Sequence, residues 1–442
     1  MKKILLNVKT IAVALACVWA VNGFAKGEPV ITVVYDGNNA TVTVPDSLKD
    51  IIKYEIKGAH VNIKPTDTNE YEYSLSGSSN NGSFTLINKD KCKVKIELAG
   101  LNLTSQKGAA LDVEVSKTVE IKVKKGTENN LVDCKDGDQK ACIYVKGHAE
   151  FTKKGVLNVT GNTKQGIKVS EYMLVDEDCN INILGAPADG IHCGKAVDAE
   201  PGTEEAENNY FIINSGKVTV KNVAGDCIDT DDYGCVNITG GELELYVDHK
   251  YDPNDPGGVK AIKVPHTFTM TGGTVNIDVK GEDNDGIKVN QYAYFNGGTI
   301  NINVDGDGCK GIKIEKDEID GEMSHGYAEF NGTDITITAK GGTFKYEEDV
   351  AFCNGMAVEG DMIQTAGTIK IDTTGDDITP LYTTNAPVLK GGELIINGQP
   401  LAIQDLIAVD NLNSKLFNLS GQMVNESYRG VVIYRGKKMF RH

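Results

Sequence analysis

Apolar and polar residues alternate in short segments along most of this chain, and the segments recur in a fixed order. One segment reads Gly/Ala-Ile-Lys-Val/Ile, with central isoleucines at 167, 262, 287 and 312, and weaker copies centre on Ile191 and Ile228. A second segment begins Gly-Gly-Thr or Gly-Gly-Glu and continues as an alternating strand, as in Gly272–Ile277 and Gly297–Ile302. A third carries aromatic residues, as in Tyr292–Phe295. Period-two alternation of this kind predicts β-strands.

The spacing of the copies predicts the fold. Several of them are 24 or 25 residues apart, with longer steps of 37 and 34 residues on either side of Ile228. Three short strands in about 25 residues are typical of one coil of a parallel β-helix, in which stacked coils bury their inward residues against one another. We therefore expect an all-β, right-handed parallel β-helix over residues 61–403, with N-terminal cap strands over 26–60 that cover the open edge of the first coil.

Both ends of the chain differ from these repeats. Residues 1–25 combine three lysines with an apolar stretch and small residues before Lys26, which is the pattern of a secretory signal peptide. The net charge of the whole chain is −17, and loss of these three lysines would make it −20. So strong an acid excess argues against nucleic-acid binding, and no segment after residue 25 predicts membrane insertion. The sequence leaves the oligomeric state open.

Stacking also predicts which side chains share a face. If the isoleucines point inward, the residues that follow them point outward in one column, and the residues two positions before them form a second column. The first column contains Tyr144, Lys168, His192, Asp229, Lys263, Lys288 and Lys313, and the second contains Asp189, Asp226 and Asp285. Asp231 and Asp232 follow at the same turn as Asp229.

Carboxylates that lie this close repel one another unless a cation neutralises them. Ca²⁺ binds six to eight oxygen ligands, so we expect Asp189, Asp226, Asp229, Asp231, Asp232 and Asp285 to hold Ca²⁺. The alternative is that these aspartates serve only local turn hydrogen bonds. A neutral glycan would instead need aromatic platforms, and because Trp19 is the only tryptophan, exposed tyrosines would have to supply them. The tyrosines available for this role are Tyr233, Tyr246, Tyr251 and Tyr292.

Four segments together carry a family resemblance: GIKV, ADGIHCGKAV, GDCIDTDDYG and GGTVNIDV. They resemble the secreted carbohydrate-binding β-helix family of the cellulose- and pectin-binding clostridial type, over roughly residues 60–400. That family is similar in fold to polysaccharide lyase family 9. The resemblance implies a plant cell-wall polysaccharide, including acidic pectic chains, as the partner, and bound Ca²⁺. It also implies that Asp189, Asp226, Asp229 and Asp232 match the calcium ligands of those lyases, with Lys263 in the place of their base.

Residues 404–442 carry a different resemblance. Leu416–Val424 and Tyr428–Ile433, followed by Gly436-Lys437-Lys438, resemble the C-terminal sorting tail of type IX secretion in Bacteroidetes, which implies delivery to the cell surface. Three functions stay open at this point. The first is a secreted or surface carbohydrate-binding protein that uses His192, Lys263, Lys288, Lys313, Tyr233 and Tyr251 as ligand contacts. The others are a Ca²⁺-dependent lyase with Lys263 as base, and a structural or adhesive surface solenoid.

Overall fold

The structure is a computed structural model, and it describes most of the chain between residues 29 and 441. The described ranges are 29–88, 92–137, 139–194, 209–231, 233–253, 258–316, 318–319, 322–323, 326–346, 349–375, 377–401, 416–418, 423–424, 430–434 and 437–441. These residues form β-strands, turns and one 3₁₀ turn, η1 (Asp46–Leu48), and no α-helix occurs among them. The predicted signal peptide, residues 1–25, lies outside them.

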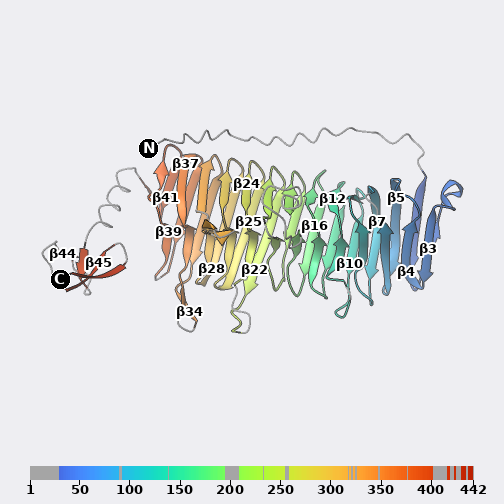
Figure 1. The fold of residues 1–442 in the computed structure, drawn as a ribbon, viewed down its shortest axis with the longest axis horizontal. Coiled ribbons are helices and arrows are strands. Elements are labelled where there is room, and N and C mark those ends of the chain that lie inside the picture. The colour runs from blue at the N-terminus through green and yellow to red at the C-terminus, as the bar shows by residue number, and fades with distance from the viewer. Residues whose placement is uncertain are drawn as a thin grey trace.

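Three long parallel ladders make up the body of the molecule, which is a stack of coils running from β3 to β41 (Figure 1). The first ladder contains β1 (Val30–Asp36), β5 (Tyr71–Ser79), β7 (Val94–Thr104), β9 (Thr118–Val123), β12 (His148–Thr152), β15 (Met173–Val175), β18 (Tyr210–Ile213), β21 (Cys235–Ile238), β24 (Thr267–Met270), β27 (Tyr292–Phe295), β32 (Gly326–Asn331), β37 (Gly360–Ala366) and β40 (Val388–Leu389).

The second ladder starts on the later halves of β5 and β7. It continues through β10 (Glu128–Val132), β13 (Val156–Thr160), β16 (Asn180–Gly185), β19 (Lys217–Val220), β22 (Glu242–His249), β25 (Thr274–Glu282), β28 (Thr299–Asp307), β33 (Asp334–Lys340), β38 (Thr368–Thr373) and β41 (Glu393–Ile396).

The third ladder is a sheet of its own. It contains β4 (Ala59–Pro65), β6 (Gly82–Asn88), β8 (Leu111–Val115), β11 (Ala141–Val145), β14 (Gln165–Val169), β17 (Ile191–Cys193), β20 (Ile228–Thr230), β23 (Lys260–Val264), β26 (Asp285–Val289), β29 (Lys310–Ile314), β36 (Asn354–Val358) and β39 (Thr379–Thr383). The chain visits the third, first and second ladders in turn, so each coil adds one rung to each ladder. This arrangement is consistent with the predicted parallel β-helix.

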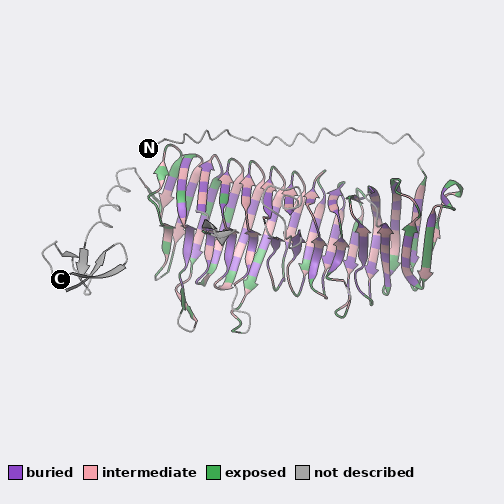
Figure 2. Ribbon diagram, viewed as in Figure 1, coloured by how far each residue is buried: buried purple, intermediate pink, exposed green. Residues whose placement is uncertain are grey.

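The register predicted from the isoleucine spacing is confirmed. Ile191 pairs with Ile228, and Ile228 pairs with Ile262, although the steps between them are longer than the usual period. The isoleucines are fully buried and form one inward column. The first ladder adds an aromatic column, in which Phe295 and Phe330 stack with their ring centroids 4.7 Å apart. The inward sides of all three ladders together form one continuous core, seen as the purple stripes along the strands in Figure 2.

Asparagine side chains tie neighbouring coils together on the outer face of the second ladder. The Nδ2 atom of Asn182 donates to Oδ1 of Asn158 at 2.8 Å, and Asn301 donates to Asn276 at 2.9 Å. Asn158 in turn donates to Asn130, which donates to Asn102. An amide both donates and accepts, so a column of asparagines satisfies itself. The amide column therefore runs over four successive coils from Asn102 to Asn182, and Asn276 and Asn301 repeat it on two later coils.

Antiparallel strands occur near both ends of the stack. At the N-terminal end β1 pairs with β2 (Asn39–Thr43), and β3 (Ile52–Lys57) pairs with β4. At the other end β41 pairs with β42 (Gln399–Pro400). A separate four-stranded antiparallel sheet contains β43 (Leu416–Asn418), β44 (Met423–Val424), β45 (Gly430–Tyr434) and β46 (Lys437–Arg441), within the predicted sorting tail.

Two further hairpins are inserted between coils. β30 (Glu318–Ile319) pairs with β31 (Glu322–Met323), and β34 (Phe344–Tyr346) pairs with β35 (Asp349–Ala351). The second hairpin lies between β33 and β36, on the side of the stack where the loop after β22 also projects (Figure 1). Both of these segments therefore border the N-terminal ends of the third-ladder strands.

Candidate functional site

A column of charged side chains runs along the outer face of the third ladder. Lys168 on β14 pairs in register with His192 on β17, which pairs with Asp229 on β20, and Asp229 pairs with Lys263 on β23. The column continues through Lys288 and Lys313. Neighbouring strands lie about 4.8 Å apart, so each of these charges has another within reach. The predicted column is therefore present, with one acid, Asp229, between the basic groups of His192 and Lys263.

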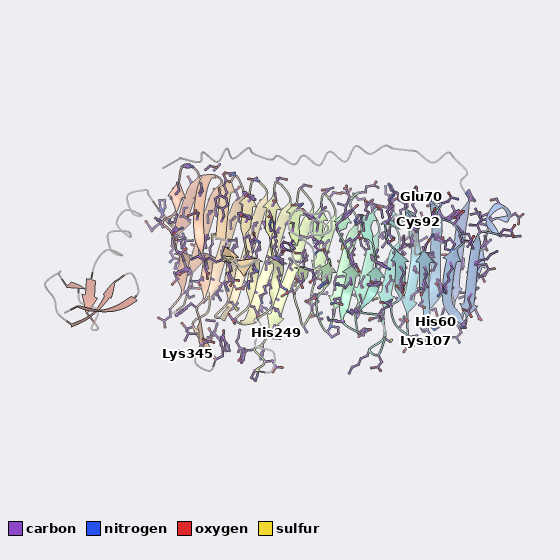
Figure 3. All side chains as sticks on the ribbon, viewed as in Figure 1. His60, Glu70, Cys92, Lys107, His249 and Lys345 are labelled. Atoms are coloured by element: carbon purple, nitrogen blue, oxygen red, sulfur yellow. The ribbon has the colours of Figure 1, made fainter. Side chains whose placement is uncertain are left out.

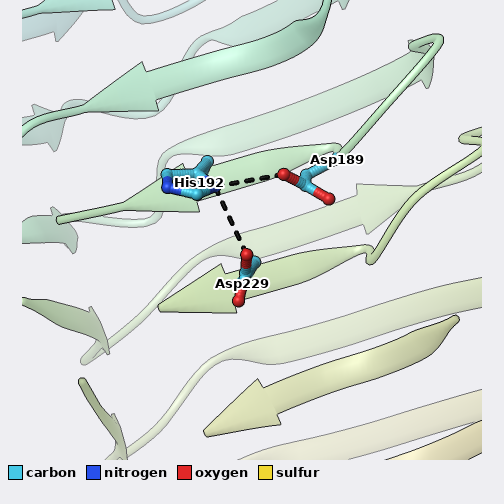
Figure 4. Close-up of side chains that lie close together, drawn as sticks. All are labelled: Asp189, His192 and Asp229. Carbon is cyan, nitrogen blue, oxygen red and sulfur yellow. Dashed lines mark hydrogen bonds and ion pairs between the residues drawn. The ribbon is translucent and has the colours of Figure 1, made fainter. Parts of the chain in front are cut away.

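His192 lies at the centre of a cluster of carboxylates, which we call the acidic cluster: Asp189, Asp226, Asp229 and Asp231. Its Nδ1 atom is 3.0 Å from Oδ2 of Asp189 and 3.4 Å from Oδ2 of Asp229 (Figure 4). Its Nε2 atom is 2.9 Å from Oδ2 of Asp231. Because both ring nitrogens face carboxylate oxygens, the ring is placed as a doubly protonated imidazolium that donates on both sides.

The carboxylates set the pKa of this histidine. Burial alone lowers the pKa of His192, but the hydrogen bonds to Asp189, Asp229 and Asp231 outweigh burial and raise it to about 10. The same contacts act on two of the acids. Burial raises the pKa values of Asp189 and Asp231, yet the contacts with His192 hold both below the ordinary value.

Lys263 neutralises the other side of the acidic cluster. Its Nζ atom lies 3.1 Å from Oδ1 of Asp229 and 3.7 Å from Oδ2 of Asp226. Burial lowers the pKa of Lys263, but the charges of Asp229 and Asp226 outweigh it and raise the pKa above its ordinary value. Asp226 is also buried, and burial, with the neighbouring Asp229, raises its pKa to about 7. Its side chain is therefore partly protonated near neutral pH.

Two of these aspartates also hold the coils together. Oδ1 of Asp189 accepts the backbone N–H of Asp226 at 3.1 Å, and Oδ1 of Asp226 accepts the backbone N–H of Lys260 at 2.7 Å. Each carboxylate thus bridges to the coil that follows it. The second oxygens of both groups point toward His192 and Lys263. One oxygen of each carboxylate therefore accepts a structural backbone hydrogen bond, and the other oxygen faces a cation of the acidic cluster.

Asp285 lies apart from the acidic cluster. It occupies the same column as Asp226, but the coil with Lys260 and Lys263 lies between them. The nearest cations to it are on the next coil, where Nζ of Lys310 is 3.9 Å from its Oδ1 atom, which is buried. Lys288 and Lys313 both contact Glu315, Lys288 at 2.8 Å. The structure thus separates the predicted residues into two groups along one face.

The predicted tyrosines Tyr233 and Tyr251 are not members of the acidic cluster. Tyr233 follows the turn beyond Asp231 and has a backbone φ of +58°, in the left-handed region. Tyr251 lies in the loop after β22 and contacts Phe344 and Tyr346 of the β34 hairpin, with ring centroids 5.2 Å and 5.3 Å apart. His249 and Lys345, which lie close to these rings in sequence, are labelled at the lower edge of the stack in Figure 3. Asp232 lies outside the described residues.

A metal ion is chemically compatible with part of the cluster. Ligand atoms of Asp189, His192 and Asp229 all lie within 4.8 Å of one another. The oxygens of Asp189, Asp226, Asp229 and Asp231 suit Ca²⁺, whereas an imidazole nitrogen is not a usual calcium ligand. In the structure His192 and Lys263 contact the oxygens that an ion would need. A calcium ion bound here would therefore replace these internal cations at the carboxylates.

Two participants were not among the site residues predicted from the sequence. Lys168 lies 3.8 Å from Oδ2 of Asp231 and donates to the carbonyl of Gly194, and burial lowers its pKa. It stands in the predicted column one coil before His192, so the repeat itself was the signal. The repeat does not predict a role for Glu315, because this residue follows the end of β29 and is not in the column. Its side chain nevertheless extends to Lys288.

Comparison with known proteins identifies the family. A family model described as "Carbohydrate-binding domain-containing protein" matches residues 57–283 and 257–423, which together span most of the chain. The chain belongs to this carbohydrate-binding family. A family relative, a carbohydrate-binding domain-containing protein of Acetivibrio thermocellus, is 24% identical over 162 residues, which are 35% of this chain and 53% of the relative. The chain thus spans about half the length of that relative.

A solved structure is also similar. It is described as the polysaccharide lyase-like protein from C. thermocellum, gadolinium derivative, and it matches with 18% identity and a TM-score of 0.39, covering 70% of this chain and 94% of that one. Within the described part of this family member, no helix is long and apolar enough to cross a membrane.

Proposed function

We propose that this carbohydrate-binding protein recognises an acidic, pectic-type polysaccharide on the outer face of its third ladder, with Ca²⁺ bridging the acidic cluster and the uronate groups. The observation that carries the proposal is the stacking of coils, which brings Asp189, Asp226, Asp229 and Asp231 together beside a row of lysines. A chain of net charge −17 repels a polyuronate at long range, and a bound cation would supply local attraction.

The lysines contribute a second source of attraction. Lys263, Lys288 and Lys313 stand on three successive rungs, so their ammonium groups follow the ladder at about the strand spacing. Lys263 is the most open of them, with 41% of its side chain exposed. If calcium takes over Asp226 and Asp229, Lys263 is released to pair with a uronate carboxylate. Tyr251 and its aromatic neighbours border the same face and offer an apolar contact for a sugar ring.

The proposal is tested by binding of polygalacturonate in calcium and in chelator. The variant Asp226→Asn/Asp229→Asn is expected to lose at least tenfold in affinity in calcium, and the unaltered protein is expected to lose binding in chelator. The control is Asp46→Asn/Asp50→Asn, which changes the net charge equally at two exposed positions of the N-terminal cap. Binding that ignores the chelator, or that falls equally in both variants, would refute the calcium bridge.

A lyase activity is the second candidate, because Lys263 lies directly against two of the acids. β-Elimination needs an unprotonated base at the start of the reaction. Asp229 and Asp226 raise the pKa of Lys263, so a metal ion would first have to neutralise them. The test is the ultraviolet absorbance of unsaturated products from polygalacturonate, and its loss in Lys263→Ala. If no glycan binds and no product forms, the structural or adhesive role is the remaining one.

We also infer export and the full architecture of the fold. Residues 1–25 have the pattern of a signal peptide, and residues 404–442 resemble a type IX sorting tail, so we propose a secreted or surface-attached protein. The winding is proposed to be a right-handed parallel β-helix closed by the N-terminal antiparallel strands, since parallel crossovers are right-handed in nearly all proteins. Fractionation of the native cells, with mass spectrometry of both chain ends, tests the export.

A further inference from the structure

A groove crosses the outer face of the second ladder, on a different sheet from the acidic cluster. Its volume is about 240 Å³, and it spans the four successive strands β22, β25, β28 and β33. The outward residues Tyr246, Asp278, Asn303 and Thr338 line it as one row, because each pairs in register with the next. A parallel row of Asn276 and Asn301 lies two residues earlier on the strands. The groove is therefore a product of the coil stacking and not of a loop.

The lining of this groove combines apolar surface with polar side chains and carries almost no charge. Asp278 is the single ionisable acid among its lining residues, and no basic group is present there. The rest of the row offers a phenol, an amide and a hydroxyl, which both donate and accept hydrogen bonds. Within the described part of the chain, the Asp278, Asn303 and Thr338 side chains make no hydrogen bond to the protein. These groups are available to form hydrogen bonds with an external partner that has donors and acceptors of its own.

Tyr246 stands at one end of the row and is 42% exposed. An exposed ring beside amide and hydroxyl groups suits a sugar, whose C–H face packs on the ring while its hydroxyls reach the polar row. The volume is slightly below that of pockets for drug-sized ligands, so it fits one or two residues of a longer glycan that continues over the open face. The lack of charge argues against a uronate and against a nucleic acid, both of which need cationic contacts.

We propose that this groove is a second glycan-binding site, which takes an uncharged polysaccharide, stacks one ring on Tyr246 and needs no metal ion. It is independent of the acidic cluster, because the two sites lie on different sheets and share no residue. A protein with both sites would hold an acidic and a neutral chain of the same cell-wall material at once. Binding at one site would raise the effective concentration of the material at the other, so the overall affinity would exceed that of either site alone.

The test measures binding of soluble xyloglucan and mixed-linkage β-glucan to the full chain in chelator. We expect the unaltered protein to bind one of them, Tyr246→Ala to lose roughly tenfold or more in affinity, and Asn303→Ala to lose several-fold. Tyr246→Phe retains the ring and is expected to keep most of the affinity. Tyr54→Ala is the matched control, because Tyr54 is 47% exposed on β3 and lies outside the groove. Circular dichroism of each variant checks that the fold is intact.

The outcomes separate this site from the acidic one. Loss of neutral-glycan binding in Tyr246→Ala, with retention in Asp226→Asn/Asp229→Asn, supports the groove even if polygalacturonate does not bind. Absence of binding to either neutral glycan overturns the proposal, as does binding that Tyr246→Ala and Asn303→Ala leave unchanged. Calcium-dependent binding of the neutral glycan would assign it to the acidic cluster and would also overturn the groove.

Discussion

Replacing His192 with glutamine tests how the acidic cluster is held together. The imidazolium faces oxygens of Asp189, Asp229 and Asp231 at 3.0, 3.4 and 2.9 Å, and its side chain is buried. Glutamine keeps a similar length and some hydrogen bonding but carries no charge. Among the described residues, Lys263 and Lys168 are then the cations within 4 Å of these four carboxylates. Breaking a buried ion pair by removing one partner costs about 3–5 kcal/mol, so we expect a loss of about 3 kcal/mol in chelator after partial compensation by glutamine.

Calcium should reverse much of that loss if it binds these aspartates. A ligand at about one hundred times its Kd stabilises the folded state by about 2.7 kcal/mol, and His192→Gln offers the ion carboxylates with one fewer competing internal cation. Lys263 and Lys168 still compete with calcium in this variant, but the imidazolium no longer does, so we expect millimolar calcium to stabilise His192→Gln more than the unaltered protein. The measurement is urea unfolding followed by circular dichroism, in calcium and in chelator, since tryptophan is absent after residue 19.

His60→Gln is the matched control for this experiment. His60, at the end of the N-terminal cap, bonds to Ser83 and Asn81, and no ion pair with a carboxylate is present at it among the described residues, so its replacement should cost little in either condition. A small, calcium-independent effect of His192→Gln would show that the cluster does not depend on its central cation. A large loss that calcium does not restore would refute calcium binding by these aspartates while leaving the ion-pair geometry in place.

Three further predictions concern the stack itself. Phe295→Ala removes a fully buried ring stacked on Phe330 and should destabilise the chain by about 3–5 kcal/mol in urea unfolding; a loss under 1 kcal/mol would contradict the close packing of that column. Burial raises the pKa of Asp112 to about 6, so stability falls as the pH rises from about 4 to about 6 and stays lower above that range. Asp112→Asn should therefore gain up to about 3 kcal/mol at pH 7 and little at pH 4. A gain that is equal at both pH values would rule out that cause. Gly281→Ala should destabilise far more than Gly100→Ala in the same measurement, because both have φ near +80° to +90° but only at Gly281 would a Cβ meet a backbone oxygen, at 1.7 Å, and equal effects would be evidence against the close approach.

The sequence alone determined the columns of the stack. A strand alternates its side chains with period two, and a parallel ladder repeats at one spacing, so a phrase that recurs around Ile167 and Ile191 already states which residues share a face. This is why the pairing of Ile191, Ile228 and Ile262 could be predicted across steps of 37 and 34 residues. The register of the ladder is the same on both sides of these longer steps.

Only the tertiary structure decided what the outward residues do with one another. Column position brings Asp229 beside His192 and Lys263, but rotamer choice and burial decide that the imidazole joins three carboxylates and that Asp226 is buried deeply enough to hold a proton near neutral pH. Asp285, in the same column as Asp226, meets Lys310 instead because a coil with two lysines lies between them. The groove at Tyr246 likewise depends on side-chain sizes over four coils. Such pairings follow from distances within a few ångströms, which a repeating pattern of residue types does not contain.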